Sequence, residues 1–359
     1  MSQTRSSYVV RGEPRREDLE VWNLKRILPI LSFLVLLSLA AGSQATAMTF
    51  KLATLVPDRS VWGNVLSEMA AEWKEATDGR VTLRIYPGGV AGDDPDVVRK
   101  MRIGQLHAGT ITQAGLTEID NAFNLFNTPL FFDSYDEYFY VLEQIQPALE
   151  KVLRDKGFEL LHWGHGGWVH LFATKRVESV DDLKALKLFV WAGSDRMVRW
   201  WKDAGYKPVP LAFTDVVTGL QTGMLEAMPN TPLAALSFQN YRNTPFMLGL
   251  GFAPFLGATL VTTKAWDRLD SNDRQAIMDS VERAAERFRT EVPEQDAKAI
   301  TEMEKRGLTV TSVEDPVLVR QWRAEAEKFA AAMREDFVPA YIYDLAVAAR
   351  QKFRAANPR

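Results

Sequence analysis

From residue 48 onward, short segments that alternate apolar and polar residues are followed by segments with helical periodicity. Residues 50–56 alternate as a strand does, and apolar residues three and four apart follow over 62–73. Residues 81–86 again predict a strand, which ends in the turn at 87–89. This alternation of strands and helices predicts parallel sheets covered by helices.

The next helix has a defined start and end. Asp94 can cap it, and Pro95 suits its first position, where a missing backbone N–H costs nothing. We expect this helix to end at Gly104 and to be followed by a strand of small residues at 107–112.

The pattern starts again in the second half of the chain. Strands are expected at 158–162, 169–173, 186–191 and 208–211. Helices are expected at 194–204, from a cap at Thr214 to about 225, from a cap at Ser271 to about 306 with a bend at Pro293, near 316–335 and near 337–355. The apolar, glycine-containing stretch 248–263 predicts strands that cross between two lobes. Two α/β lobes joined by crossing segments fit this order better than two domains in series.

The N-terminus has the pattern of an export signal. Lys25-Arg26 precede about fifteen mostly apolar residues, and the small residues Ala45-Thr46-Ala47 follow them. We predict cleavage after Ala47 and a mature protein in the periplasm. The alternative is an uncleaved anchor, for which the apolar run is short, since a span needs roughly 20 residues. The polar residues 1–22 are unusual for a signal, and translation that begins near Val21 would explain them.

Composition narrows the class of protein. The chain has no cysteine, so we expect neither a lipid anchor nor disulfides, and its length is enough to bury a large core. The net charge is −3, and removing residues 1–47 takes away six basic and four acidic side chains, which leaves −5. This acidic balance argues against nucleic acid and anionic lipid as partners. No cofactor or metal is expected, because no cysteine or acidic cluster accompanies the histidines His107, His162, His165 and His170.

Four segments carry a resemblance to a known family. Residues 167–171 (GWVHL), 182–190 (DLKALKLFV), 209–223 (VPLAFTDVVTGLQTG) and 264–269 (KAWDRL) resemble, in order, segments of the DctP-type solute receptors of TRAP (tripartite ATP-independent periplasmic) transporters. The resemblance extends over nearly all of residues 49–305. It implies an α/β, two-lobed fold like that of periplasmic binding proteins, with mixed sheets, crossing strands and a long bracing helix.

The resemblance also implies a function and partners. A receptor of this family captures a small solute between its lobes, closes by a hinge motion and delivers the solute to a small and a large membrane subunit that use an ion gradient. We therefore expect no enzymatic activity. The expected organisation is an N-terminal extension and signal peptide at 1–47, lobe I at 48–166 plus about 254–295, and lobe II at 167–253 plus about 296–359.

The positions that would hold a ligand carboxylate depart from the family pattern. Family members place an arginine in the segment equivalent to 182–190, and some place a second one in the segment equivalent to 167–171. This chain has Phe189 and Val169 there. Because a buried carboxylate without a cationic partner is strongly unfavourable, we expect a hydrophobic pocket and an apolar or aromatic organic ligand.

Six further residues are candidates for this pocket, each with an ordinary structural alternative. Asn230 occupies the position of a family asparagine and could bond a ligand oxygen or cap a turn. Trp191 shares the strand face of Phe189, and both rings could instead belong to the core. The other candidates are Trp163, Trp168, Gln113 after the strand at 107–112, and Trp62 at the start of the first helix.

Two other classes of function compete with the receptor. A hydrolase finds support only in residues 165–167, which resemble an oxyanion-hole loop, and the chain has no G-x-S-x-G nucleophile motif. A soluble periplasmic carrier of lipid-like molecules would share the apolar pocket but have no TRAP membrane partner. Gene neighbourhood separates these classes: genes for the two membrane subunits favour transport, and a gene for a helical-repeat periplasmic protein favours an accessory partner for hydrophobic cargo.

Overall fold

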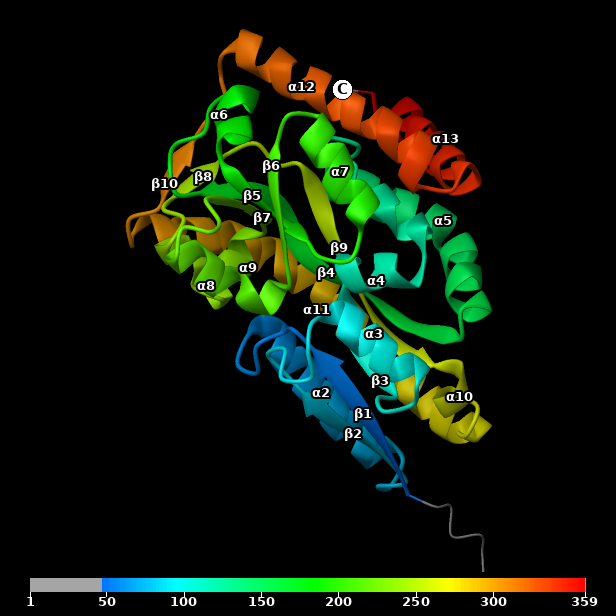
Figure 1. Ribbon diagram of the computed structural model, residues 1–359. Coiled ribbons are helices and arrows are strands. Elements are labelled where there is room, and N and C mark those ends of the chain that lie inside the picture. The colour runs from blue at the N-terminus through cyan, green and yellow to red at the C-terminus, as the bar shows by residue number, and fades with distance from the viewer. Residues whose placement is uncertain (1–46, 359) are drawn as a thin grey trace, which may run out of the picture. The chain divides into compact units, whose positions relative to one another are not determined.

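The computed structural model describes residues 47–358 of the chain (Figure 1). The predicted export signal lies outside these residues, so its cleavage after Ala47 stays a prediction. No helix within residues 47–358 is long and apolar enough to cross a membrane.

Two sets of parallel strands are joined by antiparallel ones. The strands are β1 (Met48–Thr54), β2 (Val81–Tyr86), β3 (Ala108–Thr112), β4 (Phe158–Ala173), β5 (Lys187–Trp191), β6 (Lys207–Leu211), β7 (Ala227–Asn230), β8 (Phe246–Leu248), β9 (Ala253–Thr262) and β10 (Thr309–Thr311). Their order is β2-β1-β3-β9-β4-β7-β5-β6, with β8 paired to β4 and β10 to β8. Strands β1, β2 and β3 are parallel to one another, as are β5, β6 and β7. Strands β9 and β4 run antiparallel between the two sets.

Helices follow most of the strands. They are α2 (Val61–Ala76), α3 (Asp94–Arg102), α4 (Gln113–Ile119), α5 (Tyr135–Asp155), α6 (Val180–Ala185), α7 (Asp195–Asp203), α8 (Val216–Gln221), α9 (Pro232–Ser237), α10 (Thr263–Trp266), α11 (Ser271–Glu304), α12 (Pro316–Ala332) and α13 (Ala340–Ala356). Short 3-10 turns lie at η1 (Asn121–Asn127), η2 (Phe213–Asp215) and η3 (Asn240–Arg242), and a π turn, η4 (Met333–Phe337), separates α12 from α13. The expected mixed sheets, crossing strands and long helix are confirmed.

The predicted cap of α3 is wrong by one residue. Asp93 has the extended backbone of a cap and accepts the backbone N–H of Asp94. Asp94 is instead fully buried, and its Oδ2 accepts hydrogen bonds from the backbone N and the Oγ1 of Thr112, at 2.7 and 2.6 Å. Its side chain therefore ties α3 to the end of β3.

Two other predicted caps are also wrong. Asp270, not Ser271, caps α11, because its Oδ1 is the atom that accepts the free N–H groups of the first turn. Thr214 lies inside the turn η2, and α8 begins after Asp215 without a side-chain cap.

The segments predicted as separate strands at 158–162 and 169–173 form one strand, β4. It pairs with β9 along most of its length and with β7 and β8 near its end. The pairing with β9 shifts between Leu160 and His162 and again between His165 and Trp168. These bulges let the strand continue through its glycine-containing middle, where the sequence pattern is interrupted.

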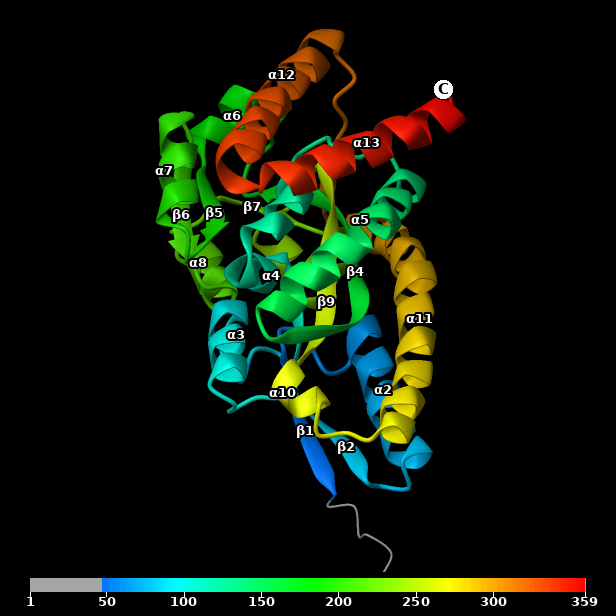
Figure 2. The same cartoon turned by 90° about the vertical axis from the view of Figure 1, so that its right-hand side faces the viewer.

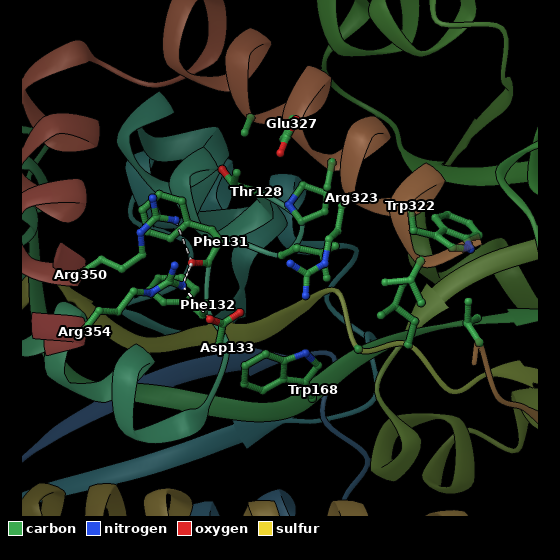
Figure 3. Close-up of a pocket in the computed structure, with 18 of the residues that line it drawn as sticks. Thr128, Phe131, Phe132, Asp133, Trp168, Trp322, Arg323, Glu327, Arg350 and Arg354 are labelled. Atoms are coloured by element: carbon green, nitrogen blue, oxygen red, sulfur yellow. Dashed lines mark hydrogen bonds and ion pairs between the residues drawn. The ribbon is translucent and has the colours of Figure 1, made fainter. Parts of the chain in front are cut away.

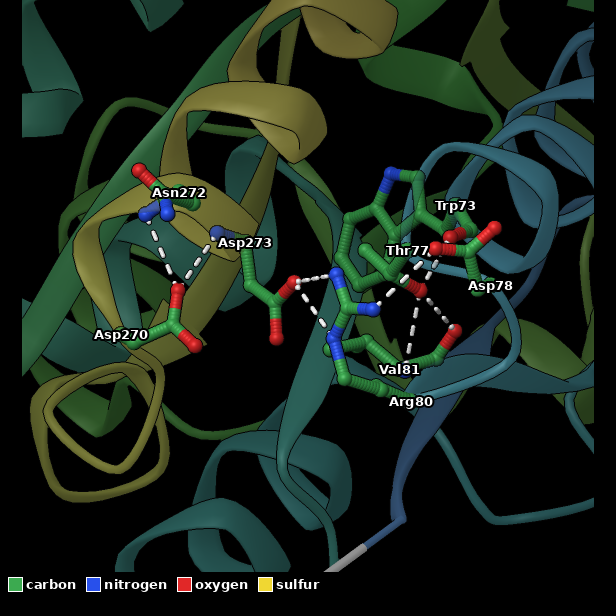
Figure 4. Close-up of polar contacts among 8 residues, drawn as sticks. All are labelled: Trp73, Thr77, Asp78, Arg80, Val81, Asp270, Asn272 and Asp273. Atoms are coloured by element: carbon green, nitrogen blue, oxygen red, sulfur yellow. Dashed lines mark hydrogen bonds and ion pairs between the residues drawn. The ribbon is translucent and has the colours of Figure 1, made fainter. Parts of the chain in front are cut away.

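Helix α11 braces both sets of strands. It continues through Pro293 for 34 residues and packs against α2, β4 and α9 (Figure 2). Its first turn is tied to the segment between α2 and β2 (Figure 4). There Arg80 donates from Nε and Nη2 to Oδ1 of Asp273, at 3.2 and 2.8 Å. Thr77 Oγ1, at the end of α2, bonds the backbone of Val81 at the start of β2.

The last helix packs against the first half of the chain. Helix α13 lies along α5, and both belong to one hydrophobic cluster with β9 and η1. The predicted lobe boundaries stay a prediction, and this contact joins residues expected in lobe II to residues expected in lobe I.

Candidate ligand-binding site

The carboxyl ends of the two parallel sets of strands meet at one edge. In α/β folds, ligands bind beyond the carboxyl ends of parallel strands. The backbone N–H of Phe213, just after β6, donates to Oδ2 of Asp93, before α3, at 2.9 Å. A Cβ on Gly89, after β2, would lie 3.0 Å from Cγ2 of Thr214. We call this region, where the ends of β1, β2 and β3 approach those of β5, β6 and β7, the strand-end edge.

The lobe I side of the strand-end edge carries two buried carboxyl groups. Burial raises the pKa of Asp93, and hydrogen bonds from Phe213 and Asp94 oppose the shift. Burial raises the pKa of Asp94 to about 7, against the hydrogen bonds from Thr112. Both carboxyl groups are therefore weaker acids than an exposed aspartate.

The lobe II side is aromatic. Trp191, at the end of β5, stacks on Phe213 with ring centroids 5.4 Å apart and planes at 14°. Phe189 meets Trp191 edge-on at 5.6 Å, and Phe238 meets Phe213 edge-on at 5.1 Å. We call these four residues the aromatic cluster. Phe189 is only 2% exposed and packs in the core, whereas Trp191 is partly exposed.

Asn230 lies beside this cluster at the end of β7. Leu188 pairs with Ala227, so Trp191 and Asn230, each three residues further on, lie level in neighbouring parallel strands. The Asn230 Oδ1 accepts the backbone N–H of Thr231 at 2.9 Å. Its Nδ2 is buried and has no hydrogen-bond partner within residues 47–358. A buried N–H donor without a partner suits an acceptor atom of a ligand.

Gln113 and Trp163 meet at Phe123, on the lobe I side. Gln113 directly follows β3, and its Nε2 donates to the carbonyl of Phe123 at 3.5 Å. The Trp163 ring lies 6.2 Å from the Phe123 ring, and its Nε1 is a second buried donor without a partner in the described part of the chain.

The other three predicted residues have structural contacts that limit their role. Trp62 Nε1 donates to the carbonyl of His165 at 3.1 Å, so this N–H is already used. Val169 pairs with β9, and its carbonyl accepts the N–H of Phe252. Trp168 lies apart from the aromatic cluster: its ring contacts Tyr135 at 5.1 Å and lines a cavity beside α12 and α13.

Sequence reasoning missed Asp296, which fixes the bulge of β4. This α11 residue is 5% exposed. Its Oδ2 accepts the backbone N–H of Trp168 at 2.9 Å, and its Oδ1 accepts that of Leu233, in α9, at 2.8 Å. Burial raises its pKa to about 7, and the two N–H groups oppose the shift. The available signal was an acid on the buried stripe of a helix, in line with Val292 and Ala299.

Sequence reasoning also missed Phe213. The sign that could have indicated it is its position two residues beyond β6, in the segment 209–223.

The contacts of the histidines are structural. His162 stacks on Phe288, and His165 lies among Tyr135, Tyr138 and Phe139. Burial lowers the pKa of His162 to about 4 and that of His165 to about 3, so both are neutral at pH 7. No group of three potential metal ligands occurs within residues 47–358.

The family model and the similar proteins both identify this chain as related to bacterial solute-binding proteins. Residues 52–336 match the family model described as bacterial extracellular solute-binding protein, family 7. A solute-binding protein of Chromohalobacter salexigens is 29% identical over 258 residues, covering 71% of this chain and 76% of the relative. An ectoine/5-hydroxyectoine-binding periplasmic protein of Ruegeria pomeroyi is 24% identical over 306 residues, covering 84% and 88%.

Solved structures share the fold. An extracytoplasmic solute receptor of Bordetella pertussis that binds pyroglutamic acid superposes with a TM-score of 0.78 at 18% identity, covering 85% of this chain and all of that one. A TRAP periplasmic solute-binding protein of Chromohalobacter salexigens with bound D-glucuronate gives 0.76 at 23% identity, covering 84% and 99%. The predicted two-lobed fold, like that of periplasmic binding proteins, is confirmed.

Proposed function

This chain belongs to family 7 of the bacterial extracellular solute-binding proteins, the DctP family of solute receptors, and we propose that it captures a small apolar or aromatic organic solute between its two lobes. The family is one of receptors and not of enzymes. Delivery of the solute to the small and large TRAP membrane subunits is part of the proposal, as is export to the periplasm with cleavage after Ala47.

The observation that carries the ligand class is the distribution of buried charge. At the position that the family resemblance gives to the carboxylate-binding arginine stands Phe189, packed in the core. Within residues 47–358 no lysine or arginine is buried, whereas Asp93 and Asp94 are buried at the strand-end edge. A ligand carboxylate here would meet other carboxyl groups, and burial without a cationic partner disfavours it by several kcal/mol.

The groups at this edge suit a different ligand. The partly exposed face of Trp191 favours an aromatic or apolar body. Asn230 Nδ2 and Trp163 Nε1 are neutral donors that could each bond one carbonyl or hydroxyl oxygen. Val169, at the second family arginine position, is likewise uncharged. One relative above is named for ectoine and 5-hydroxyectoine, and the two solved structures are described with pyroglutamic acid and D-glucuronate, so this chain would differ from them in cargo.

The first test identifies the cargo directly. Mass spectrometry of small molecules extracted from the purified mature protein should show an aromatic or apolar compound. Succinate and D-glucuronate at millimolar concentration should leave the thermal midpoint unchanged, because only a ligand that binds the native state stabilises it. A rise of several degrees with either acid would refute the apolar ligand class while leaving the receptor function intact.

A matched pair of variants locates the site. Trp191→Ala should weaken binding of the extracted compound by about tenfold or more, since it removes a stacking face at the strand-end edge. Trp266→Ala removes a partly buried tryptophan of α10, which contacts Arg274, and should leave binding unchanged. Equal affinities of the two variants would place the ligand elsewhere.

The alternative function, a periplasmic carrier without a TRAP partner, shares this site and differs in delivery. Reconstitution with candidate small and large TRAP membrane subunits separates the two. Receptor-dependent, ion-gradient-driven uptake of the extracted compound supports transport. Transfer of the compound to an acceptor membrane without these subunits supports the carrier. A helical-repeat accessory protein, if encoded alongside, should accelerate loading of the receptor.

A further inference from the structure

A second cavity lies away from the strand-end edge. It has a volume of about 800 Å³ and lies between the loop at 128–133, Leu250 and Gly251, and the helices α12 and α13 (Figure 3). Binding sites for small molecules span roughly 300–1,000 Å³, so the cavity is large enough for one. None of the aromatic cluster, Asn230, Gln113 and Trp163 lines it.

Three arginines line this cavity, together with the acidic residues Asp133 and Glu327. Arg354 is neutralised, because it donates to Glu137 and forms an ion pair with Asp133 at 3.0 Å. Arg350 lies 4.0 Å over the Phe131 ring and donates only to the Phe131 carbonyl, at 3.0 Å. Its guanidinium forms no direct ion pair with a carboxylate within residues 47–358.

Arg323 is the cavity arginine whose guanidinium donors are all unused within residues 47–358. Its side chain is exposed on α12 and has no hydrogen bond or ion pair with any residue in the described range 47–358, although Glu327 lies one turn further along. Figure 3 shows its guanidinium extending from α12 towards the indole of Trp168. A planar guanidinium with free N–H groups can bind a carboxylate through two parallel hydrogen bonds.

The opposite wall is a fixed aromatic surface. Trp168 is held by the hydrogen bond from its backbone N–H to Asp296 and by the edge contact of its ring with Tyr135. A Cβ on Gly251 would lie 2.4 Å from the Trp168 ring, so the glycine is what lets the indole occupy this place. The ring therefore presents a flat apolar surface that is organised before any ligand arrives.

We propose that this cavity is a second binding site, which takes an organic anion with a flat aromatic body. The body lies against Trp168, and the carboxylate binds the free N–H groups of Arg323. Arg350 adds positive charge from the α13 wall. The two sites thus select opposite chemistries: a carboxylate is disfavoured at the strand-end edge and required here.

Calorimetric titration with two probes of equal shape tests the proposal. The mature protein should bind 2-naphthoate and should bind the neutral 2-naphthamide at least about tenfold more weakly, because only the anion pairs with Arg323. Arg323→Gln should weaken the binding of 2-naphthoate by about tenfold and leave the binding of 2-naphthamide unchanged. Arg320→Gln removes another exposed arginine of α12, outside the cavity, and should bind both probes as the wild type does.

Two further variants assign the position. Ala330→Trp fills the cavity from α12 and should abolish 2-naphthoate binding. Trp191→Ala, at the strand-end edge, should preserve it. The proposal is overturned if the wild type does not bind 2-naphthoate, or if Arg323→Gln and Ala330→Trp both bind it as the wild type does. It is equally overturned if Trp191→Ala is the variant that loses binding, a result that would instead place the probe in the site of the proposed function.

Discussion

The strand-end edge and the cavity beside α12 and α13 differ in the charged side chains that they hold. The edge holds the buried carboxyl groups of Asp93 and Asp94 beside the aromatic cluster. The cavity holds three arginines, of which Arg323 has no partner in the described part of the chain. Both regions contain aromatic rings, so hydrophobicity does not distinguish them. The position of the guanidinium groups does, because the three arginines lie away from the strand-end edge, where we propose that the ligand binds.

One short segment connects the two regions. The bulge of β4 at Gly166 and Gly167 leads directly into Trp168, which lines the cavity. Asp296 holds this bulge and, through Leu233, the start of α9 next to Asn230. Two kinds of substitution therefore test whether the fold maintains the difference in charge between the two regions. One kind changes the charge of a region, and the other disturbs the bulge that connects the regions.

Placing an arginine at the strand-end edge should have the largest effect. Phe189→Arg puts a guanidinium into a core formed with Phe172, Met228 and Met303, where it has no partner. We expect a loss of about 4 kcal/mol in the free energy of unfolding and weaker binding of the native ligand. Denaturant unfolding followed by circular dichroism measures the first effect.

Phe189→Leu is the control for lost ring volume and should cost only about 1.5 kcal/mol. A Phe189→Arg protein that keeps wild-type stability and gains succinate binding would show that position 189 reaches the ligand. It would also show that a single side chain accounts for the difference in ligand class between this protein and its relatives.

Adding a methyl group at the bulge should have the next largest effect. Gly167 has φ +106°, and a Cβ there would lie 2.5 Å from Oδ1 of Asp296. Gly167→Ala combines an unfavourable backbone conformation with a clash against a buried carboxyl group, so we expect a loss of about 3 kcal/mol.

Gly157→Ala separates the two causes. Gly157 has φ +85°, and a Cβ there would meet no atom of the described residues within 4 Å, so only the backbone contribution, about 1 kcal/mol, should appear. Thermal or denaturant unfolding of both variants provides the comparison. Equal losses would mean that Asp296 moves aside and does not fix the bulge.

The sequence predicted the elements better than the site. Periodicity located β1 and α2, because each buries one regular face. It also located β2, although Val81 is the one buried residue of that strand. It divided β4 in two, because the glycines at its bulges break the alternation while the strand continues. Helix caps shifted by one residue wherever two capping residues stand side by side, as at Asp93 and Asp94, since only backbone geometry chooses between them.

The candidate site depended on contacts that are remote in sequence. That Trp191 and Phe213 stack could not be read from strand patterns, because the contact depends on how β5 and β6 pair. The arginines of the cavity come from α12 and α13, far along the chain from Trp168, so no local motif indicates them.

Removing the carboxyl group between the two regions should have the smallest effect on stability and a distinctive pH dependence. In Asp296→Asn one of the two backbone N–H groups, of Trp168 or Leu233, faces an amide N–H₂ and loses its acceptor, and we expect a loss of about 2 kcal/mol. Glu294→Gln is the control on the same helix, because Glu294 is exposed and pairs only with Lys298.

The pH profile sharpens this test. Since burial raises the folded-state pKa of Asp296 from 3.8 to about 7, the native state takes up a proton more readily than the unfolded chain. The stability contributed by this group is therefore complete below about pH 4 and is lost as the pH rises through about 7.

Other titrating groups do not affect the comparison. The pKa of Asp94 is also raised, but Asp94 is present in both proteins. The raised pKa of Tyr135, which faces Asp296, keeps that phenol neutral throughout. The stability difference between wild type and Asp296→Asn should accordingly shrink from pH 4.5 to pH 8. If the two pH profiles run parallel while Glu294→Gln matches the wild type, Asp296 does not titrate in this range, and the connection between the two regions carries a permanent charge.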